Sequence, residues 1–304
     1  MIALRRRSQR GSIAIAGSMN LPHTIPEKTI DCAGKPLDLS RPRIMGVLNI
    51  TPDSFSDGGD FFAPENAVTR AEQMVEEGAD IIDVGGESTR PGAAAVSLDE
   101  ELQRVIPVIE ALHVTVPVPI SIDTSKPAVM QAAVAAGAGL INDVSALQET
   151  GAVEMAASLG VPVCLMHMQG NPETMQATPA YINVVDEVTA YLEARADACM
   201  QQGIPKERIL LDPGFGFGKT TAHNLLLLQQ LERLVETGFP VLVGLSRKSL
   251  IGKVLDLPVD KRVYPGVALA VLAVWQGAAL VRCHDVRPTR EAIEMCQAVR
   301  NAGL

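Results

Sequence analysis

The chain contains 304 residues, of which 47% are hydrophobic and only 3% aromatic, so its core is large and mainly aliphatic. Asp and Glu outnumber Lys and Arg by 35 to 26, which gives a formal net charge of −9 at pH 7. This acidity argues against a nucleic-acid partner, because nucleic-acid-binding surfaces need clustered cations. The longest nearly apolar run, residues 267–281, is shorter than the roughly 20 residues that span a bilayer, which argues against a membrane protein.

The cysteines and the N-terminal segment indicate the expected compartment. The five cysteines are an odd number and form no CxxC pair, so we expect neither a disulfide framework nor a structural zinc site. A reducing compartment, the cytoplasm, is therefore predicted. Residues 1–28 contain Arg5, Arg6, Arg7 and Arg10 but only a short apolar stretch, unlike a signal peptide. We interpret them as a flexible extension, in which Met19 is a candidate alternative start.

The remaining chain reads as a regular alternation of strands and helices. Residues 29–38 predict a hairpin, and from residue 43 onward short aliphatic runs alternate with longer segments of helical period. Each run is continuously apolar, which is typical of strands buried on both faces of a parallel sheet. The eight runs are residues 44–50, 80–84, 118–123, 140–144, 161–166, 208–212, 240–245 and 280–283. The eight predicted helices are residues 64–78, 98–112, 126–136, 151–159, 179–203, 222–237, 261–276 and 288–301.

The spacing of these elements favours a (β/α)8 barrel, the TIM-barrel class of α/β folds. Strand ends recur about every 33 residues, which suits eight βα units better than the two halves of a doubly wound sheet. An open doubly wound sheet is the alternative fold. No low-complexity linker interrupts residues 43–301, so we expect a single barrel domain over residues 29–304, with the hairpin covering its floor.

Polar side chains follow every predicted strand, at the end where (β/α)8 enzymes carry their active sites. Asp123, Asn142 and Asp212 supply two carboxylates and an amide, which together suit the edge of a flat, nitrogen-rich heterocycle. Helix capping is the alternative role for Asp123 and Asn142. The sequence therefore predicts a heterocycle-binding site at the mouth of the barrel.

A second group at the same end is cationic and consists of Arg90, Lys248, Arg282 and His284. Arg282 and His284 flank one residue of an extended strand, so both face the same side and suit a phosphate or pyrophosphate. Pairing of Arg282 with Asp285 or another surface acid is the alternative. His167 is as readily a buried supporting histidine as a catalytic one.

The glycine-rich segment DPGFGFGKT at residues 212–220 resembles a P-loop, but it has Pro213 where that motif requires glycine. We therefore reject nucleotide binding by this segment. Its glycines permit a tight loop that either brings Phe217 against a ligand or packs this ring on the barrel rim.

Seven motifs together resemble the dihydropteroate synthase family of the folate pathway. They are MGVLNITPDSFSDGG (45–59), DVGGESTRPG (83–92), IDTSK (122–126), IND (141–143), DPGFGFGK (212–219), SRKS (246–249) and RCHD (282–285). The resemblance runs in one collinear order from about residue 30 to the C-terminus. It implies a transferase that condenses (7,8-dihydropterin-6-yl)methyl diphosphate with 4-aminobenzoate to give 7,8-dihydropteroate and diphosphate, requires Mg2+, forms homodimers through its late helices and is the target of sulfonamides.

The resemblance also implies roles for individual residues. The pterin edge is assigned to Asp123, Asn142 and Asp212, with Lys248 beside the ring. The diphosphate is assigned to Arg90, Arg282 and His284, with Asn49 as the Mg2+ ligand. The surroundings of 4-aminobenzoate are assigned to Thr89, Pro91, Phe217, Lys248 and Ser249. Lys248, Arg282, His284 and Asp212 are the residues expected to carry the chemistry, and loops 51–63 and 88–98 are expected to close over bound diphosphate.

Departures from the family pattern are few. Cys283 stands where an aliphatic residue is usual, and its side chain is expected to face away from the site. Residues 264–267 differ from the usual polar start of the seventh helix, which concerns the dimer contact. The rival interpretations are a methyltetrahydrofolate:corrinoid methyltransferase, which has no use for a diphosphate clamp, and a catalytically silent paralogue that only binds pterin.

Overall fold

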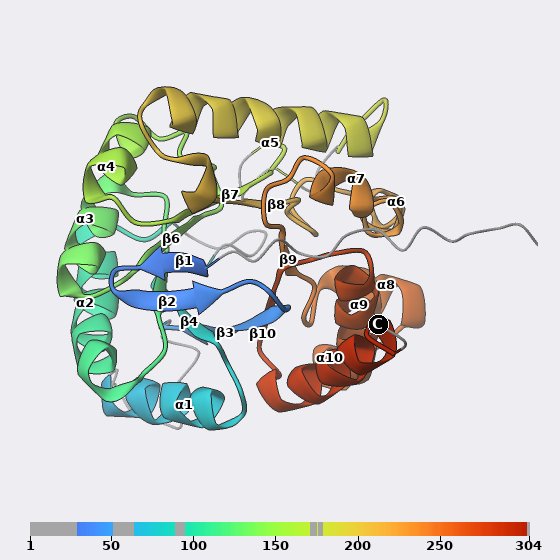
Figure 1. Cartoon of the computed structure of the whole chain (residues 1–304), viewed down its shortest axis with the longest axis horizontal. Helices are drawn as coiled ribbons and strands as arrows, with labels where there is room; N and C mark the ends of the chain where they lie inside the picture. Colours follow the sequence, from blue (N-terminus) through green and yellow to red (C-terminus); the bar gives the residue numbers. More distant parts are fainter. Residues whose placement is uncertain (1–28, 51–63, 89–94, 171–174, 176–178, 303–304) are drawn as a thin grey trace, which may run out of the picture.

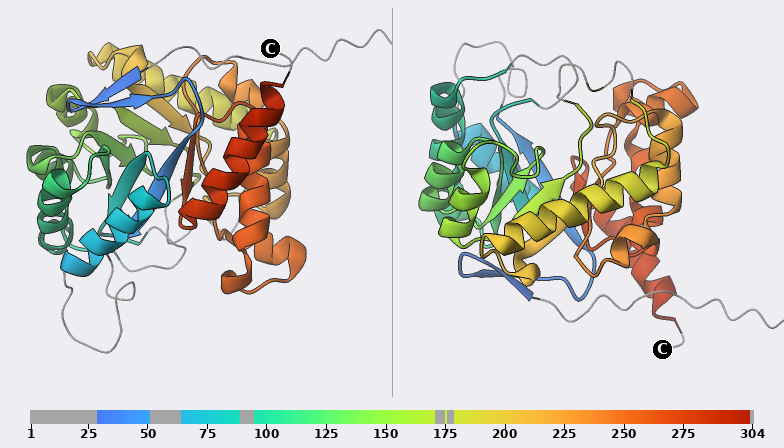
Figure 2. Two further views of the ribbon diagram at one scale, coloured as in Figure 1. Left: turned by 60° about the horizontal axis from the view of Figure 1, so that its bottom comes forward. Right: turned by 90° about the horizontal axis from the view of Figure 1, so that it is seen from above.

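The computed structural model describes residues 29–50, 64–88, 95–170, 175 and 179–302. In this part of the chain a ring of parallel strands is surrounded by helices (Figures 1 and 2). The barrel strands are β3 (Arg43–Asn49), β4 (Ile81–Gly85), β5 (Ile120–Asp123), β6 (Leu140–Asp143), β7 (Val163–Met166), β8 (Ile209–Asp212), β9 (Leu242–Gly244) and β10 (Leu280–Cys283).

Hydrogen bonds join these strands in the order β8-β7-β6-β5-β4-β3-β10-β9, and every named pair is parallel. The two end strands also meet. Leu211 of β8 forms a parallel bridge with Val241, and the Leu211 amide donates to the carbonyl of Pro240 at 3.0 Å. The sheet therefore closes on itself, which confirms the predicted (β/α)8 barrel, and the open doubly wound sheet is wrong.

Helices follow the strands and cover the outside of the barrel. They are α1 (Pro64–Glu76), α2 (Leu98–Thr115), α3 (Pro127–Ala136), α4 (Ala152–Leu159), α5 (Val184–Gln201), α6 (Thr221–Gln229), α7 (Glu232–Val235), α8 (Ser249–Leu255), α9 (Val263–Trp275) and α10 (Val286–Arg300). The main hydrophobic core lies between the outer faces of the strands and these helices. Among the described helices, none is both long and apolar enough to cross a bilayer.

Three helix predictions need correction. The segment 222–237 is not one helix: α6 ends at Gln229 and α7 begins at Glu232. Because of the turn between them, both Leu231 and Leu234 are buried. Helix α8 lies outside the predicted set; it begins at Ser249, after the N-cap Lys248 and after Arg247, whose φ of +58° makes the turn out of the barrel. The last helix begins at Val286 rather than at residue 288, so Pro288 lies in its first turn, where proline is tolerated.

The predicted N-terminal hairpin is present and covers one end of the barrel (Figures 1 and 2). It consists of β1 (Thr29–Cys32) and β2 (Lys35–Asp38), paired antiparallel. Its buried residues pack on the interior side chains at the start of the strands, and we call this set the floor cluster: Ile30, Cys32, Leu37, Leu39, Met45, Ile81, Leu140, Cys164, Leu210, Leu242 and Leu280. Contact is close, because a Cβ atom on Gly139 would lie 2.3 Å from the Cys32 carbonyl oxygen. The active-site end must therefore be the opposite one.

Candidate active site

Neighbouring strands bring polar side chains to the same level at their carboxyl ends. In the strand register, Asn49 pairs with Gly85, Gly85 with Asp123, and Asp123 with Asn142. Asp212 is the last residue of β8. The two aspartates and Asn142 are buried, and Asn49 is half-buried. Residues that are far apart in the sequence thus meet at one end of the barrel, as predicted.

The alternative role of Asp123 and Asn142 as helix caps is wrong. The N-cap of α3 is Lys126, which makes no side-chain capping bond, and the N-cap of α4 is Gly151. Both polar side chains are instead turned toward other polar groups of the barrel interior.

Arg282 lies at the centre of these groups. Its Nε donates to Asp83 Oδ2 at 2.6 Å, and its Nη2 donates to Asp123 Oδ2 at 2.7 Å. The alternative pairing of Arg282 with Asp285 is wrong, because Asp285 accepts hydrogen bonds at 2.6 and 3.1 Å from Arg247. The register explains the difference: Arg282 is within β10 and points inward, whereas Asp285 follows the end of that strand.

Asp83 is a further site residue, outside the predicted set. Its side chain is fully buried, and its Oδ2 accepts from Arg282 and from Asn142 Nδ2, the latter at 3.2 Å. Its Oδ1 has no hydrogen-bond partner within the described structure. A charged residue in the middle of the apolar run of β4 is the signal that could have identified it, because buried charges are rare without a partner.

The electrostatics of this interior are those of buried, paired charges. Burial raises the pKa of Asp123 to about 7, although the adjacent guanidinium of Arg282 works in the opposite direction. Burial likewise raises the pKa of Asp212, which the Gly214 amide, Lys248 and Arg282 partly offset. Burial disfavours the charge of Arg282, yet Asp83 and Asp123 hold its pKa above the ordinary value. The site therefore holds a permanent cation beside two carboxyls, Asp123 and Asp212, whose pKa values are raised.

On the other side of the mouth, the segment after β9 faces the end of β10. Ser246 Oγ accepts a hydrogen bond from the His284 amide at 3.3 Å and lies 3.2 Å from His284 Nδ1. This contact fixes the orientation of the imidazole. Lys248 precedes α8, with Nζ 4.2 Å from the ring centroid of Phe217, and Ser249 is exposed at the start of that helix. Three of the four predicted cations, Lys248, Arg282 and His284, thus lie at the same end of the barrel as the predicted acids, and Arg90 lies outside the described residues.

Phe217 packs on the rim of the barrel, which is one of its two predicted roles; its contact with a ligand stays a prediction. Its ring is 8% exposed and packs with Met166 and Met175, which anchors the loop to the rim of the barrel. The same ring lies under the ammonium of Lys248, an arrangement in which the negative face of an aromatic ring attracts a cation.

His167 follows β7 and is buried beside Lys219, with 2.8 Å between His167 Nδ1 and Lys219 Nζ. Burial and the neighbouring lysine lower the pKa of His167 to about 3, so its imidazole is neutral at pH 7. This environment favours a supporting histidine over a catalytic one.

Several predicted residues lie outside the described part of the chain. They are Thr89, Arg90 and Pro91, together with loop 51–63, most of loop 88–98 and the extension 1–28. Their predicted roles stay predictions.

The residues present fit a Mg2+ ion that is shared with a substrate. In the described structure no group of three or more His, Cys, Asp or Glu side chains is arranged to hold a metal. Asn49 offers one hard amide oxygen at the mouth. Mg2+ keeps several of its waters and takes oxygens from substrate phosphates, so a single neutral protein ligand is sufficient.

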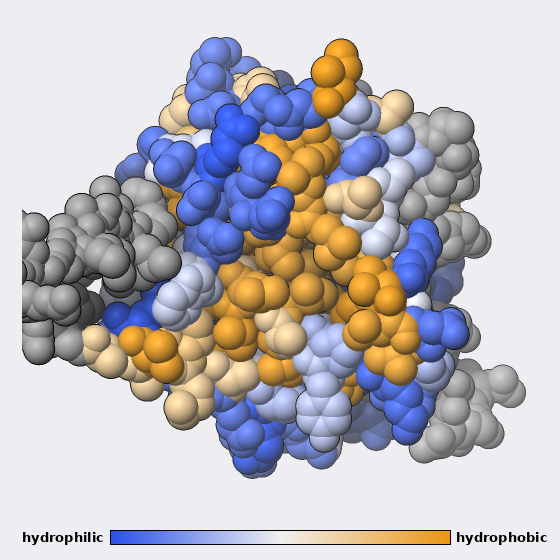
Figure 3. All heavy atoms as spheres, turned by 90° about the vertical axis from the view of Figure 1, so that its right-hand side faces the viewer, coloured by the Kyte–Doolittle hydropathy of each residue, from blue (hydrophilic) through white to orange (hydrophobic). Residues whose placement is uncertain are grey.

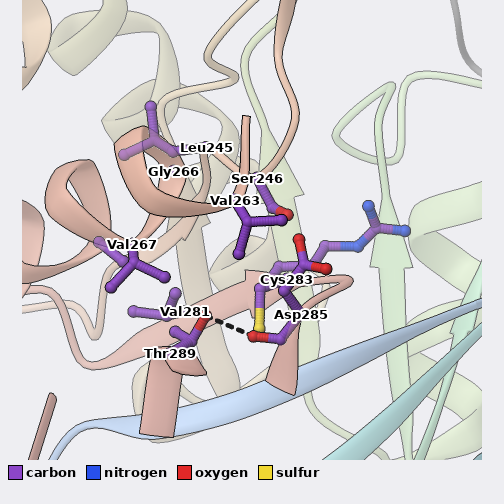
Figure 4. A pocket seen from close by; sticks show the side chains of 11 residues that line it. Leu245, Ser246, Val263, Gly266, Val267, Val281, Cys283, Asp285 and Thr289 are labelled. Atoms are coloured by element: carbon purple, nitrogen blue, oxygen red, sulfur yellow. Dashed lines mark hydrogen bonds between the residues drawn. The ribbon is translucent and has the colours of Figure 1, made fainter. Parts of the chain in front are cut away.

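Cys283 faces away from the site, as expected from the alternation of a strand. It is buried in the outer core, and a small pocket between β10 and α9 is lined by Cys283, Val267 and Thr289 among others (Figure 4). Burial raises the pKa of this thiol to about 12. The departure from the family pattern at residue 283 therefore leaves the mouth of the barrel unchanged.

Comparison with known proteins agrees with this geometry. A family described as "Pterin binding enzyme" matches residues 45–284. A dihydropteroate synthase of Haemophilus influenzae is 54% identical over 268 residues, which cover 88% of this chain and 98% of that protein. The chain belongs to the dihydropteroate synthases of the pterin-binding enzyme family. Structures of this enzyme from Xanthomonas albilineans give the same fold.

Two structures of the Xanthomonas albilineans dihydropteroate synthase are compared, each with a bound ligand. The one with 4-aminobenzoic acid has a TM-score of 0.86 and 53% identity, covering 90% of this chain and 99% of the other. The one with 7,8-dihydropteroate has a TM-score of 0.83 and 51% identity, with the same coverage. The resemblance inferred from the seven motifs is thus confirmed. The corrinoid methyltransferase alternative is set aside, because these close relatives are all dihydropteroate synthases.

Proposed function

We propose that this chain condenses (7,8-dihydropterin-6-yl)methyl diphosphate with 4-aminobenzoate to give 7,8-dihydropteroate and diphosphate. The observation that carries the proposal is the group formed at one end of the barrel by the buried Asp83, Asp123 and Asn142 and the half-buried Arg282. It offers carboxylate acceptors for a nitrogen-rich ring and a guanidinium for a phosphate within one interior site. The relatives' complexes with 4-aminobenzoic acid and 7,8-dihydropteroate supply the chemical identity of the partners.

The residues divide into three groups in this proposal. The pterin edge is held by Asp123, Asn142 and Asp212, with Lys248 beside the ring. The diphosphate is held by Asn49, Arg90, Arg282 and His284. The 4-aminobenzoate lies among Thr89, Pro91, Phe217, Lys248 and Ser249. Asp83 supports the first two groups, because it accepts hydrogen bonds from both Asn142 and Arg282.

The reaction breaks the bond between the methylene carbon of the pterin and the bridging oxygen of the diphosphate. The electron pair leaves with that oxygen, and the positive charge on the carbon is delocalised into the electron-rich ring. Arg282 and His284 favour this step because preorganised cations stabilise the departing diphosphate. The carboxyls of Asp123 and Asp212 stabilise the cation. The neutral aryl amine then attacks the carbon and loses a proton, so no strong general base is required.

Mg2+ would be held by Asn49, where its chemistry is to neutralise charge on the leaving diphosphate. The protein groups that share this task are the guanidinium of Arg282 and the imidazole of His284.

The test uses the purified full chain with Mg2+, the pterin diphosphate and 4-aminobenzoate. We expect diphosphate release only when all three are present, with dihydropteroate detected by mass spectrometry. A silent pterin-binding paralogue would release no diphosphate. A corrinoid methyltransferase would instead require cobalamin and methyltetrahydrofolate.

We also propose that the chain forms a homodimer through α8, α9 and α10. Large hydrophobic side chains on these helices are exposed, among them Tyr264 (84%), Leu272 (53%) and Met295 (65%). Figure 3 shows hydrophobic side chains gathered on this side of the molecule. Contiguous apolar surface of this kind is typical of a contact with another protein chain. Leu272→Glu is expected to convert a dimer into a monomer in sedimentation velocity; a wild-type monomer would contradict the proposal.

A further inference from the structure

The loop between β8 and α6 contains a buried lysine that the proposed reaction does not use. Lys219 is 2% exposed. Its Nζ donates to the carbonyl oxygens of Gly214 and Phe217, each at 3.0 Å, and to that of His167 at 3.3 Å. It also lies 2.8 Å from His167 Nδ1. A lysine ammonium can donate three hydrogen bonds and has no lone pair with which to accept one. This side chain therefore joins several points of the backbone.

The loop can lie close enough for these bonds because of its glycines. Gly214 has a φ of +67°, and a Cβ atom there would lie 1.9 Å from the His167 carbonyl oxygen. At Gly218, with a φ of +61°, a Cβ atom would lie 2.4 Å from the Gln169 carbonyl oxygen. The backbone of the loop therefore rests directly on the segment that follows β7, and Lys219 fills the space between the two.

Two further side chains hold the loop from the outside. Asn224 Oδ1 accepts from the Gly216 amide at 2.7 Å, and its Nδ2 donates to the Thr220 carbonyl at 2.7 Å. The hydroxyl of Tyr181 donates to the Gly218 carbonyl at 2.9 Å. The conformation of residues 213–220 is thus fixed from both sides.

The fixed loop determines the position of two residues assigned to 4-aminobenzoate. It carries Phe217, and the side chain of Lys248 packs along it, because a Cβ atom on Gly216 would lie 3.3 Å from Lys248 Cδ. The Lys248 ammonium lies over the Phe217 ring at 4.2 Å from its centroid. By contrast, Asp123 and Asn142 lie in β5 and β6, and their side-chain hydrogen bonds are to Arg282 and Asp83 rather than to this loop.

We propose that Lys219 is a positioning residue for the 4-aminobenzoate subsite, which it serves by fixing the loop that carries Phe217 and supports Lys248. This inference rests on the proposed function. Burial lowers the pKa of Lys219 to about 7, whereas Asp212 works in the opposite direction and favours the ammonium. The neutral imidazole of His167 is a suitable acceptor for it.

The test compares Lys219→Met, which keeps the length of the side chain but removes its donors, with the wild-type chain. We expect the KM for 4-aminobenzoate to rise about ten-fold or more, because three carbonyl oxygens lose their buried donor. The KM for the pterin diphosphate should rise clearly less, since Asp123 and Asn142 lie on other strands, although Asp212 adjoins the loop and accepts a hydrogen bond from the Gly214 amide at 2.7 Å. Amide hydrogen exchange of the peptide covering 213–220 should become faster.

The matched control is Lys206→Met, which removes an exposed lysine that also lies over an aromatic ring, Phe239, at 4.5 Å. It should change neither KM value. If Lys219→Met does not fold, Tyr181→Phe removes a single bond to the same loop and should raise the KM for 4-aminobenzoate selectively.

The proposal is overturned if Lys219→Met lowers the melting temperature and leaves both KM values at the wild-type level, because the lysine is then only structural. Where that variant does not fold, unchanged KM values in Tyr181→Phe overturn it, because fixing the loop then does not determine the 4-aminobenzoate subsite. An equal rise in both KM values also overturns it. A wild-type chain that forms no dihydropteroate would defeat the proposed function instead. In that case the exchange of residues 213–220 still decides whether Lys219 fixes the loop.

Discussion

The two ends of the barrel have opposite chemistry although the same strands build both. Strands β4, β6, β8 and β10 contribute four residues to the floor cluster, namely Ile81, Leu140, Leu210 and Leu280. Two positions later in the same strands stand Asp83, Asn142, Asp212 and Arg282. Side chains two positions apart face the same side of a strand, so both sets point into the barrel at successive levels. A step of two positions along each strand thus leads from a side chain that packs in the floor to one that lies in the candidate site.

The mouth holds its group of charges as hydrogen-bonded pairs, whereas the floor cluster is apolar. Isolated charges inside a protein are strongly unfavourable, and a buried pair is only acceptable with good hydrogen bonds. At the mouth, Arg282 bonds both Asp83 and Asp123, while the floor beneath is sealed by the hairpin. We infer that the floor supplies stability and that the mouth uses some of it to hold charges in place for the ligand.

The largest effect should come from Arg282→Met. It leaves the carboxyls of Asp83 and Asp123 buried without their cation, and removing one partner of a buried pair costs about 3–5 kcal/mol in the free energy of unfolding. Dihydropteroate formation should also fall by ~100-fold or more, because a preorganised charge on the leaving group is lost. Urea unfolding and initial rates measure the two effects.

Arg247→Met is the matched control for this variant. Its ion pair with Asp285 is more exposed, with 43% of the Arg247 side chain accessible, and such pairs contribute about 0–1 kcal/mol. If both variants lost the same stability, the central position that the structure gives to Arg282 would be contradicted.

Leu39→Ala should separate the two ends. Leu39 is fully buried in the floor cluster, and truncating a buried leucine costs about 2–5 kcal/mol in the free energy of unfolding. At temperatures where the variant is folded, its kcat and both KM values should stay within about two-fold of wild type, because the site lies at the other end. A selective change in KM would show that the floor and the mouth are not independent.

The protonation of Asp123 is expected to make pterin binding depend on pH. Burial raises its pKa to about 7, and the protonated carboxyl is a poorer acceptor for two ring donors. The Kd of 6-hydroxymethyl-7,8-dihydropterin, which lacks the titrating diphosphate, should therefore rise below pH 7 by up to about ten-fold per pH unit. Asp123→Asn should bind more weakly throughout and remove this dependence; an unchanged slope in the variant would assign the titration to another group.

The same shift has a consequence for stability. Between the ordinary aspartate pKa and about 7, the folded chain holds the Asp123 proton and the unfolded chain does not. The contribution of this group to stability therefore falls as pH rises through that window. The floor cluster contributes no such pH dependence between the ordinary aspartate pKa and about 7, because it contains only aliphatic side chains, Met45, Cys32 and Cys164.

Much of the site could be predicted from the sequence because parallel strands place their carboxyl ends together. Asp123, Asn142, Asp212 and Arg282 end strands or nearly end them, and the order of strands alone brings them to one mouth. The direction of Cys283 followed from alternation along β10. These inferences need only local pattern and topology.

The pairing of side chains needed the structure. Arg282 bonds Asp83, which is 199 positions earlier in the chain, rather than the neighbouring Asp285. Which of these acids it meets depends on β4 and β10 lying on either side of β3 in the barrel, and no local pattern carries that information. The role of Lys219 likewise needed the structure. Its local sequence resembles a P-loop, whereas its burial depends on how residues 213–220 rest on the segment after β7.

The smallest effect should come from Cys283→Val. This variant tests whether a residue next to the site in sequence affects catalysis when its side chain faces the outer core. Cys283 adjoins Arg282 and His284 in sequence but packs in the outer core against α9 and α10 (Figure 4). Valine is apolar and of similar size, so the change in the free energy of unfolding should stay below about 1.5 kcal/mol. Rates and both KM values should be unchanged. If this exchange altered catalysis as much as changes at its neighbours, the separation between the interior and the outer face of β10 would be wrong.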